Sequence, residues 1–314
     1  MPIVENYGRR RSAAKPTTAI GGTARRTFKR LMRYLAAIPV IGALMLLACL
    51  PVDLASAIPG KIARAVGPLM HRHRRADAAL KQFLPHLSET ERRRVLGVMW
   101  ENFGRIFGEL PHLKRILDDP DRFAFENFSQ VMDGIEEGCG IVTITGHFGN
   151  WELSPAPSYF LERFQLSFYR TLNSPPLEKY VRRLRERIAT GELVAKGSDN
   201  LRRGMQALVR GQFIGLMADQ RESKGIMVPF MGVEAPTSHA AALLTVRYGS
   251  PLLAGIVIRE RGVKFRMICR RIAVERTGDR KADILAVTSQ VNHMFGEWIR
   301  QYPEQWLWTH RRWQ

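Results

Sequence analysis

The sequence predicts an α/β fold: a central, mostly parallel, twisted sheet flanked by helices, preceded by an N-terminal membrane-anchoring helix. After Gly138, short apolar runs alternate with segments of helical periodicity, the pattern of strands joined by helices. The 314 residues, 45% of them hydrophobic, suffice for one large domain or two small ones with a sizeable core. We find no internal repeat.

The first 57 residues divide into two parts. Residues 1–33 are interpreted as a disordered basic tail, because Gly, Ala, Thr and Arg dominate its start without an apolar period. Residues 34–57 are interpreted as a membrane-anchoring helix. No residue from Tyr34 to Val52 is charged, and a span needs roughly 20 apolar residues. The basic tail would then face the cytoplasm.

Two other interpretations of this segment stay open. Residues 55–57 (ASA) resemble a cleavage site and residues 24–29 resemble a twin-arginine signal, as in a signal peptide that is removed. The segment could also be a buried core helix. A fully spanning helix would put the main domain outside, whereas an oblique or re-entrant helix, broken at Pro39 or Pro51, would leave it inside.

Residues 58–314 are expected to form the main domain. A basic run near its start includes HRHRR (71–75), which is either a solvated face or a contact with anionic lipid head groups. Ser88 and Glu91 form the S-x-x-E capping box that begins a helix. Apolar residues at helical spacing continue that helix from Leu96 to Leu110.

The later elements are expected in alternation. Strands are predicted at 141–145, 165–170, 213–219, 252–259 and 263–274. Helices are predicted at 150–163, 177–188, 199–209, 240–248 and 284–298, and a loop rich in Gly and Pro at 220–238. Trp306 and Trp308 either pack in the core, which we favour, or sit at a membrane interface.

Candidate functional residues fall at the ends of three predicted strands, where α/β folds place their sites. These residues are His147, Arg170 and Asp219. His147 could act as a general base, and Glu152 in the first turn of the next helix could hold its other nitrogen. Backbone N–H groups at that helix start could stabilise an oxyanion. The alternative is an ordinary strand-to-helix turn, because H-x4-E alone is common.

Other chemistries lack their signatures. HExxH is absent and no second His or Cys lies at a ligand spacing near His147, so we expect no metal and no other cofactor. G-x-S-x-G is absent, which disfavours a serine nucleophile. The three cysteines, Cys49, Cys139 and Cys269, are too far apart to indicate a disulfide framework or a CxxC pair.

The net charge of +19 predicts anionic partners. Nucleic acid is disfavoured because no recognised binding motif is present, and a non-catalytic membrane scaffold is a further rival. One face of the helix at 177–188 is basic. It either docks an anionic partner or is an ordinary solvated face, and it carries Lys179, Arg182, Arg183, Arg185 and Arg187.

Four motifs occur in a fixed order: HFGNWEL (147–153), YRTLNSPPL (169–177), ADQRESKGIMVPFMGVEAPTS (218–238) and PEQWLWTHRRW (303–313). Together they resemble the bacterial lipid A biosynthesis acyltransferases, the late lauroyl- or myristoyl-type enzymes of the lysophospholipid acyltransferase superfamily. The resemblance runs from about Tyr34 to the C-terminus and does not include residues 1–24.

The resemblance implies a glycerolipid acyltransferase-like domain at the bacterial inner membrane, facing the cytoplasm. It implies transfer of a fatty acyl chain from acyl carrier protein to a hydroxyl of a phosphorylated lipid A precursor, without a covalent acyl-enzyme. An alternative is another acceptor, such as a lysophospholipid or a phosphoinositol mannoside. Acyl carrier protein and the phosphorylated precursor would both account for the basic charge.

The resemblance also assigns residues. His147 becomes the general base and Glu152 its partner. Arg170 would bind phosphate or polarise the acyl carbonyl. The remaining residues expected to bind substrate are Asn173, Asp219, Pro229, Phe230, Gly232 and Thr237, with Met231 where the family usually has Phe.

Overall fold

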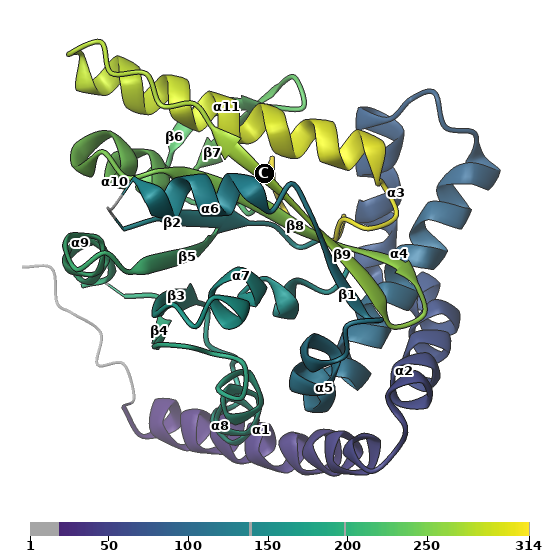
Figure 1. Cartoon of the computed structure of the whole chain (residues 1–314). Helices are drawn as coiled ribbons and strands as arrows, with labels where there is room; N and C mark the ends of the chain where they lie inside the picture. Colours follow the sequence, from purple (N-terminus) through teal and green to yellow (C-terminus); the bar gives the residue numbers. More distant parts are fainter. Residues whose placement is uncertain (1–18, 138–139, 198, 314) are drawn as a thin grey trace, which may run out of the picture.

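Seven strands form the central sheet of the computed structural model, which describes residues 19–137, 140–197 and 199–313 (Figure 1). Their order across the sheet is β1-β9-β8-β2-β5-β3-β4. They are β1 (Phe123–Glu126), β2 (Val142–Thr145), β3 (Gln165–Tyr169), β4 (Leu193–Ala195), β5 (Phe213–Met217), β8 (Leu252–Arg261) and β9 (Lys264–Ile272). Cys139 and the first 18 positions of the expected tail lie outside the described residues.

Every neighbouring pair in this sheet is parallel except β8 and β9, which form an antiparallel hairpin. The prediction of a mostly parallel sheet is confirmed. β2 lies between β8 and β5, and its apolar residues are buried, as expected for a strand whose two faces are both covered. In the β2–β5 pair Thr145 lies opposite Met217, a register that decides which later residues meet.

Helices cover both faces of the sheet. On one face, α9 (Asn200–Val209), α10 (Ala240–Tyr248) and α11 (Arg280–Gln301) pack against Ile144, Ala254 and Ile256. The opposite face, with Leu253, Val257 and Met267, is covered by α5 (Leu113–Asp118), α6 (Ser129–Glu136), α7 (Ala156–Phe160) and α8 (Pro175–Arg185). The expected layers are therefore present.

Beside the sheet, α2 (Val52–Val66) and α3 (His71–Phe83) both pack on α4 (Glu89–Glu109) (Figure 1). The predicted capping box begins α4, because the Ser88 N–H donates to the Glu91 carboxylate and the Glu91 N–H to Ser88 Oγ. α2 and α4 approach closely, since a Cβ on Gly108 would lie 1.8 Å from the Ala55 carbonyl oxygen.

The segment at 220–238, expected to be a loop, contains a second small sheet. β6 (Ile226–Phe230) and β7 (Val233–Thr237) pair antiparallel across Met231 and Gly232. These two residues have φ of 53° and 86°, the left-handed conformation of a two-residue hairpin turn. The loop prediction was wrong because the two prolines and two glycines of this segment conceal the strand pattern, although both prolines are tolerated in a two-stranded ribbon.

The helix expected at 150–163 is divided in two. A short 3₁₀ helix, η3, covers Trp151–Leu153, and α7 begins only after Pro155. Proline has no N–H to donate to a carbonyl of the preceding turn, so the helical hydrogen bonds are interrupted at Pro155, which precedes α7 as its N-cap residue. The prediction of one continuous helix was wrong at this point.

The N-terminal segment also differs from its expected bounds. α1 (Ala19–Ala48) is already helical through residues 19–33, and Pro51 separates it from α2, so residues 34–57 do not form one helix. Leu44 and Leu47 are buried, whereas Ile38 and Leu46 are exposed. Among residues whose side chains the structure describes, no helix has both the length and the apolarity needed to cross a bilayer.

Candidate active site

His147 and Asp219 meet because their strands are neighbours. Thr145 and Met217 lie opposite each other in β2 and β5, and two residues further both chains leave the sheet at the same edge. The His147 ring N–H at Nδ1 lies 2.8 Å from Asp219 Oδ1, and the His147 backbone N–H donates to Oδ2 at 2.8 Å. This arrangement leaves Nε2 of the neutral imidazole as the nitrogen with a lone pair.

The Asp219 carboxylate is fully buried and fully bonded. The Trp306 indole N–H also donates to Oδ2 at 2.8 Å, so both oxygens have partners. Burial raises the pKa of Asp219, but the His147 and His310 rings and these hydrogen bonds outweigh it and hold the pKa below its ordinary value. The carboxylate is therefore ionised at neutral pH and fixes the orientation of His147.

The contact expected between His147 and Glu152 is not the one that forms. The Glu152 carboxylate accepts two hydrogen bonds from Arg185 of α8, Nε to Oε2 and Nη2 to Oε1, both at 2.6 Å. Burial raises the pKa of Glu152, and the Arg185 charge offsets this and lowers it below the usual value. We correct the pairing: Asp219, expected to bind substrate, holds His147, and Glu152 holds Arg185.

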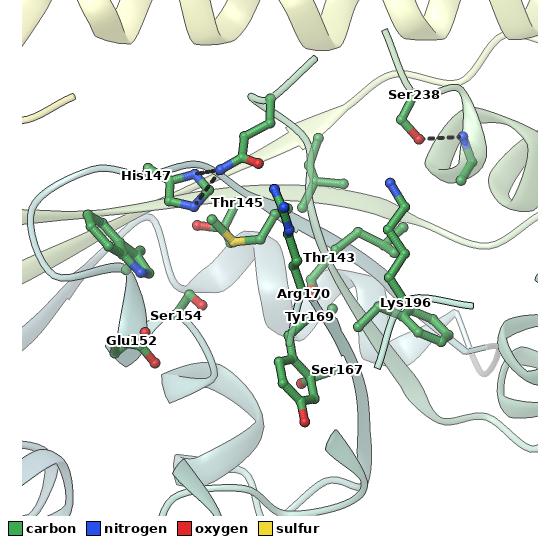
Figure 2. A pocket seen from close by; sticks show the side chains of 18 of the residues that line it. Thr143, Thr145, His147, Glu152, Ser154, Ser167, Tyr169, Arg170, Lys196 and Ser238 are labelled. Carbon is green, nitrogen blue, oxygen red and sulfur yellow. Dashed lines mark hydrogen bonds between the residues drawn. The ribbon is translucent and has the colours of Figure 1, made fainter. Parts of the chain in front are cut away.

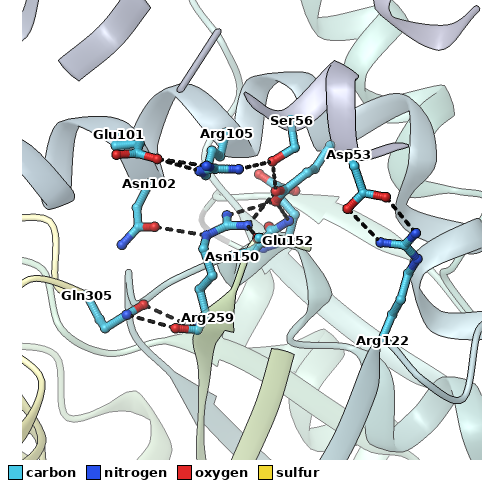
Figure 3. A network of polar contacts seen from close by, with 12 residues as sticks. Asp53, Ser56, Glu101, Asn102, Arg105, Arg122, Asn150, Glu152, Arg259 and Gln305 are labelled. Atoms are coloured by element: carbon cyan, nitrogen blue, oxygen red, sulfur yellow. Dashed lines mark hydrogen bonds and ion pairs between the residues drawn. The ribbon is translucent and has the colours of Figure 1, made fainter. Parts of the chain in front are cut away.

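A buried polar network supports the loop that carries His147 (Figure 3). Asn150 caps η3 by accepting from the Glu152 N–H, and its side-chain amide donates to Glu109 Oε2 at 2.8 Å. Glu109 is fully buried and forms a two-pronged ion pair with Arg259 of β8. Ser56 of α2 donates to the same carboxylate at 2.6 Å. α2 and β8 thus converge on Glu109 of α4, which in turn holds Asn150.

The C-terminal segment 303–313 forms the other wall of the site. The Leu307 N–H donates to the His147 carbonyl and the Gly149 N–H to the Gln305 carbonyl, both at 3.0 Å. Trp306 and Trp308 are fully buried, which confirms that they pack in the core. This segment also brings His310 against His147, with ring centroids 4.7 Å apart.

His147 opens into a cavity of about 1500 Å³ (Figure 2). One end is lined by the apolar side chains of Val131, Leu253 and Met267, from the sheet face covered by α6. Basic residues surround it elsewhere: Arg72, Arg75, Arg170, Lys196, Arg221, Lys224 and Arg311. The cavity therefore joins an apolar compartment to a positively charged one beside His147.

The structure brings only some of the expected substrate-binding residues to this cavity. Arg170 lines it and is exposed. Asn173 is exposed before α8 and does not line it. Pro229, Phe230, Gly232 and Thr237 belong to the β6–β7 hairpin on the α11 side and do not line it either. Phe230 is buried in the core, and Thr237 accepts a hydrogen bond from Arg312 at 2.7 Å.

Sequence reasoning did not identify Arg185, Gln220 or His310 as site residues. Arg185 was grouped with the exposed basic face of its helix, although it is the last residue of α8 and its side chain is directed to Glu152. Gln220 follows Asp219 directly, and its amide nitrogen lies 3.0 Å from His147 Nε2. His310 stands in an aromatic, basic motif that gives no signal for contact with a residue so distant in sequence.

His147, Asp219 and His310 are the described residues whose ligand atoms gather closely enough to hold a metal ion. Both Asp219 oxygens already accept hydrogen bonds, and one of these oxygens is bonded to Nδ1 of His147. A metal would have to break the His147–Asp219 hydrogen bond or do without the carboxylate.

The fold and the site together define an α/β protein with a buried His–Asp pair above a large cavity, the arrangement of an enzyme that uses a general base. The family model described as bacterial lipid A biosynthesis acyltransferase matches residues 24–314. The chain therefore belongs to this family and is an acyltransferase. No curated protein sequence matches it.

Proposed function

We propose that the protein transfers a fatty acyl chain from acyl carrier protein to a hydroxyl of a phosphorylated lipid A precursor. The observation that carries this proposal is the His147–Asp219 pair at the mouth of a cavity with one apolar and one basic compartment. The family supports the class of reaction. The carrier, the hydroxyl and the roles of individual residues are our inference.

In this mechanism His147 Nε2 takes the proton of the acceptor hydroxyl while Asp219 stabilises the imidazolium. The hydroxyl oxygen attacks the thioester carbonyl, the C–S bond of the tetrahedral intermediate breaks, and the carrier thiolate takes the proton back from His147. No acyl-enzyme is needed. Cys269 lines the cavity, but burial raises the pKa of its thiol to about 12, so it is not a thiolate nucleophile at neutral pH.

We propose two donors for the carbonyl oxygen. Arg185 Nη1 and Thr145 Oγ1 are buried and have no hydrogen-bond partner among the described residues, and both residues line the cavity. Buried donors without partners favour an acceptor that develops negative charge. We assign the oxyanion to Arg185, held by Glu152, and to Thr145. The exposed Arg170 is then left to bind phosphate with Lys196 and Arg221.

The surface beside the cavity suits an anionic membrane. Leu54, Ile58, Ile62 and Val66 are exposed on α2 at intervals of four residues, which places them on one face. This α2 stripe leads to Leu69, which is 84% exposed, and to Met70, which lines the cavity. Lys61 and Arg64 flank the stripe. We propose that α2 lies in the cytoplasmic surface of the inner membrane and delivers the lipid acceptor to the mouth.

The test uses the purified full chain with acyl carrier protein loaded with a fatty acid and a lipid A precursor that has a free hydroxyl. Mass spectrometry should find one added acyl chain on the precursor. His147→Ala should lower turnover by roughly 10²–10⁴-fold and keep the circular dichroism of the wild type. Normal turnover by folded His147→Ala would refute the base. Transfer only to a lysophospholipid would refute the acceptor.

A further inference from the structure

We infer that His310 is a positioning residue for His147 and acts through the side-chain amide of Gln220. The inference rests on the proposed function, because it concerns how the base presents its lone pair to the acceptor hydroxyl. The three side chains come from different parts of the chain: the loop after β2, the loop after β5 and the C-terminal segment. All three line the cavity.

The Gln220 amide lies beside the His147 ring rather than in front of Nε2. Its nitrogen is 3.0 Å from Nε2 and 3.4 Å from Nδ1 (dashed lines at His147 in Figure 2). A group placed along the in-plane lone pair of Nε2 would lie much farther from Nδ1, which points the other way to Asp219. The lone pair of Nε2 is therefore directed elsewhere, toward the cavity that His147 lines.

The second contact of the amide explains why it stays there. The Gln220 amide nitrogen lies 3.4 Å from His310 Nε2, so one N–H is directed to His310 and the other to His147. Without His310 the amide would be free to turn in front of Nε2, where it would compete with the acceptor hydroxyl. His310 thus withdraws a donor that would otherwise cap the base.

This role requires His310 to be neutral, because a protonated imidazole has no acceptor. Burial, and next the neighbouring His147, lower the pKa of His310 to about 3. The charge of Asp219 raises the pKa of His310, and the charge of Arg72 lowers it. The two rings thus have different roles. Asp219 is hydrogen-bonded to His147, which can carry the proton, whereas His310 stays neutral and serves as an acceptor.

The surroundings fix His310 firmly. The carbonyl of the preceding Thr309 accepts from Arg75 of α3 at 3.3 Å. Two residues later, fully buried Arg312 donates to the Pro236 carbonyl, to Thr237 and to Asn292 of α11. Trp313 donates to the Phe230 carbonyl and stacks on Phe83. The position of His310 is therefore set by α3, α11 and the β6–β7 hairpin.

The test uses two neutral variants of the full chain. In His310→Gln the amide oxygen can occupy the place of Nε2, whereas in His310→Asn the shorter side chain reaches only the place of Nδ1. We expect His310→Asn to lower kcat by about tenfold, the effect of one hydrogen bond, with little change in KM. His310→Gln should recover most of the loss. Gln220→Ala combined with His310→Asn should show non-additive effects on kcat, because the two residues act as a unit.

A second readout separates this inference from the proposed function. Nitrogen-15 NMR of the imidazole of His147 reports its tautomer and hydrogen bonds without any turnover. The His310→Asn variant should change the Nε2 signal of His147 and leave the Nδ1 signal, and His310→Gln should restore it. Equal losses in both folded variants, or an Nε2 signal unchanged in His310→Asn, would overturn the positioning role. Absence of acyl transfer by the wild type with the expected NMR pattern would overturn only the proposed function.

Discussion

Two carboxylates lie near the base, and their partners distinguish them. Asp219 faces the imidazole of His147, which carries a charge only when it is protonated, whereas Glu152 faces the permanently charged Arg185. The first pair can stabilise a charge that appears only during the reaction. The second neutralises a charge that is always present, and so it holds a cation inside the protein.

This difference predicts opposite consequences for two isosteric changes. Asp219→Asn should lower kcat by about 10³-fold or more, because the amide favours the wrong tautomer of His147, with a smaller effect on unfolding. Glu152→Gln should leave Arg185 without its counter-charge and lower the free energy of unfolding by about 3–5 kcal/mol. Urea denaturation and steady-state kinetics on both variants check this. Equal effects of the two changes on stability would contradict it.

At the scale of elements, the sequence predicts the central strands well because each is a short apolar run bounded by turn residues, as at 141–145 and 213–219. It does not predict which strands are neighbours. The contact between His147 and Asp219 depends on the adjacency and register of β2 and β5. Without that knowledge, the sequence favours pairing His147 with Glu152, which is only five residues away. The sequence did not predict the β6–β7 hairpin because Pro229 and Pro236 interrupt the alternation of apolar and polar residues that marks a strand.

The α2 stripe gives a prediction for one helix. Ile58 and Ile62 are 45% and 57% exposed, and replacing both with Asp should strongly reduce flotation of the protein with vesicles that contain anionic phospholipid. Leu285 on α11 is similarly exposed, at 48%, and offers the control. Leu285→Asp should float like the wild type. If the control and the double variant bind alike, α2 is not the membrane-contacting element.

At the scale of the whole molecule, the surface charges behind the net charge of +19 and the buried titratable groups respond differently to salt. Mutual repulsion of surface charges is screened by salt, whereas buried groups such as His310 and Asp219 are screened much less.

The basic face of α8 is smaller than the sequence indicates. Arg185 is turned inward to Glu152 and Arg182 pairs with Glu186. The other exposed residues of this face, which we propose for contact with acyl carrier protein, are Lys179, Arg183 and Arg187.

Global stability should fall in weak acid because of buried histidines. The pKa of His310 is about 3 in the fold against an ordinary 6.5, so between these values the unfolded chain binds the additional proton. Above pH 6.5 His310 is neutral in both states and does not change the free energy of unfolding. As the pH falls below 6.5, the free energy of unfolding decreases by at most about 1.4 kcal/mol per pH unit. Urea unfolding between pH 7 and 5 should show a shallower decline in His310→Gln. Parallel curves for the two proteins would contradict the buried neutral state.

The C-terminal segment also bears on how the protein is made. During synthesis, the loop of His147 leaves the ribosome long before residues 305–307. Of these, Gln305 and Leu307 form hydrogen bonds with the loop, and Trp306 donates to Asp219. During synthesis, the sheet and α2 can form while His147 still lacks these restraints. If α2 contacts the membrane as we propose, a nascent chain can make this contact before its catalytic loop is complete, and membrane contact then precedes acyl transfer.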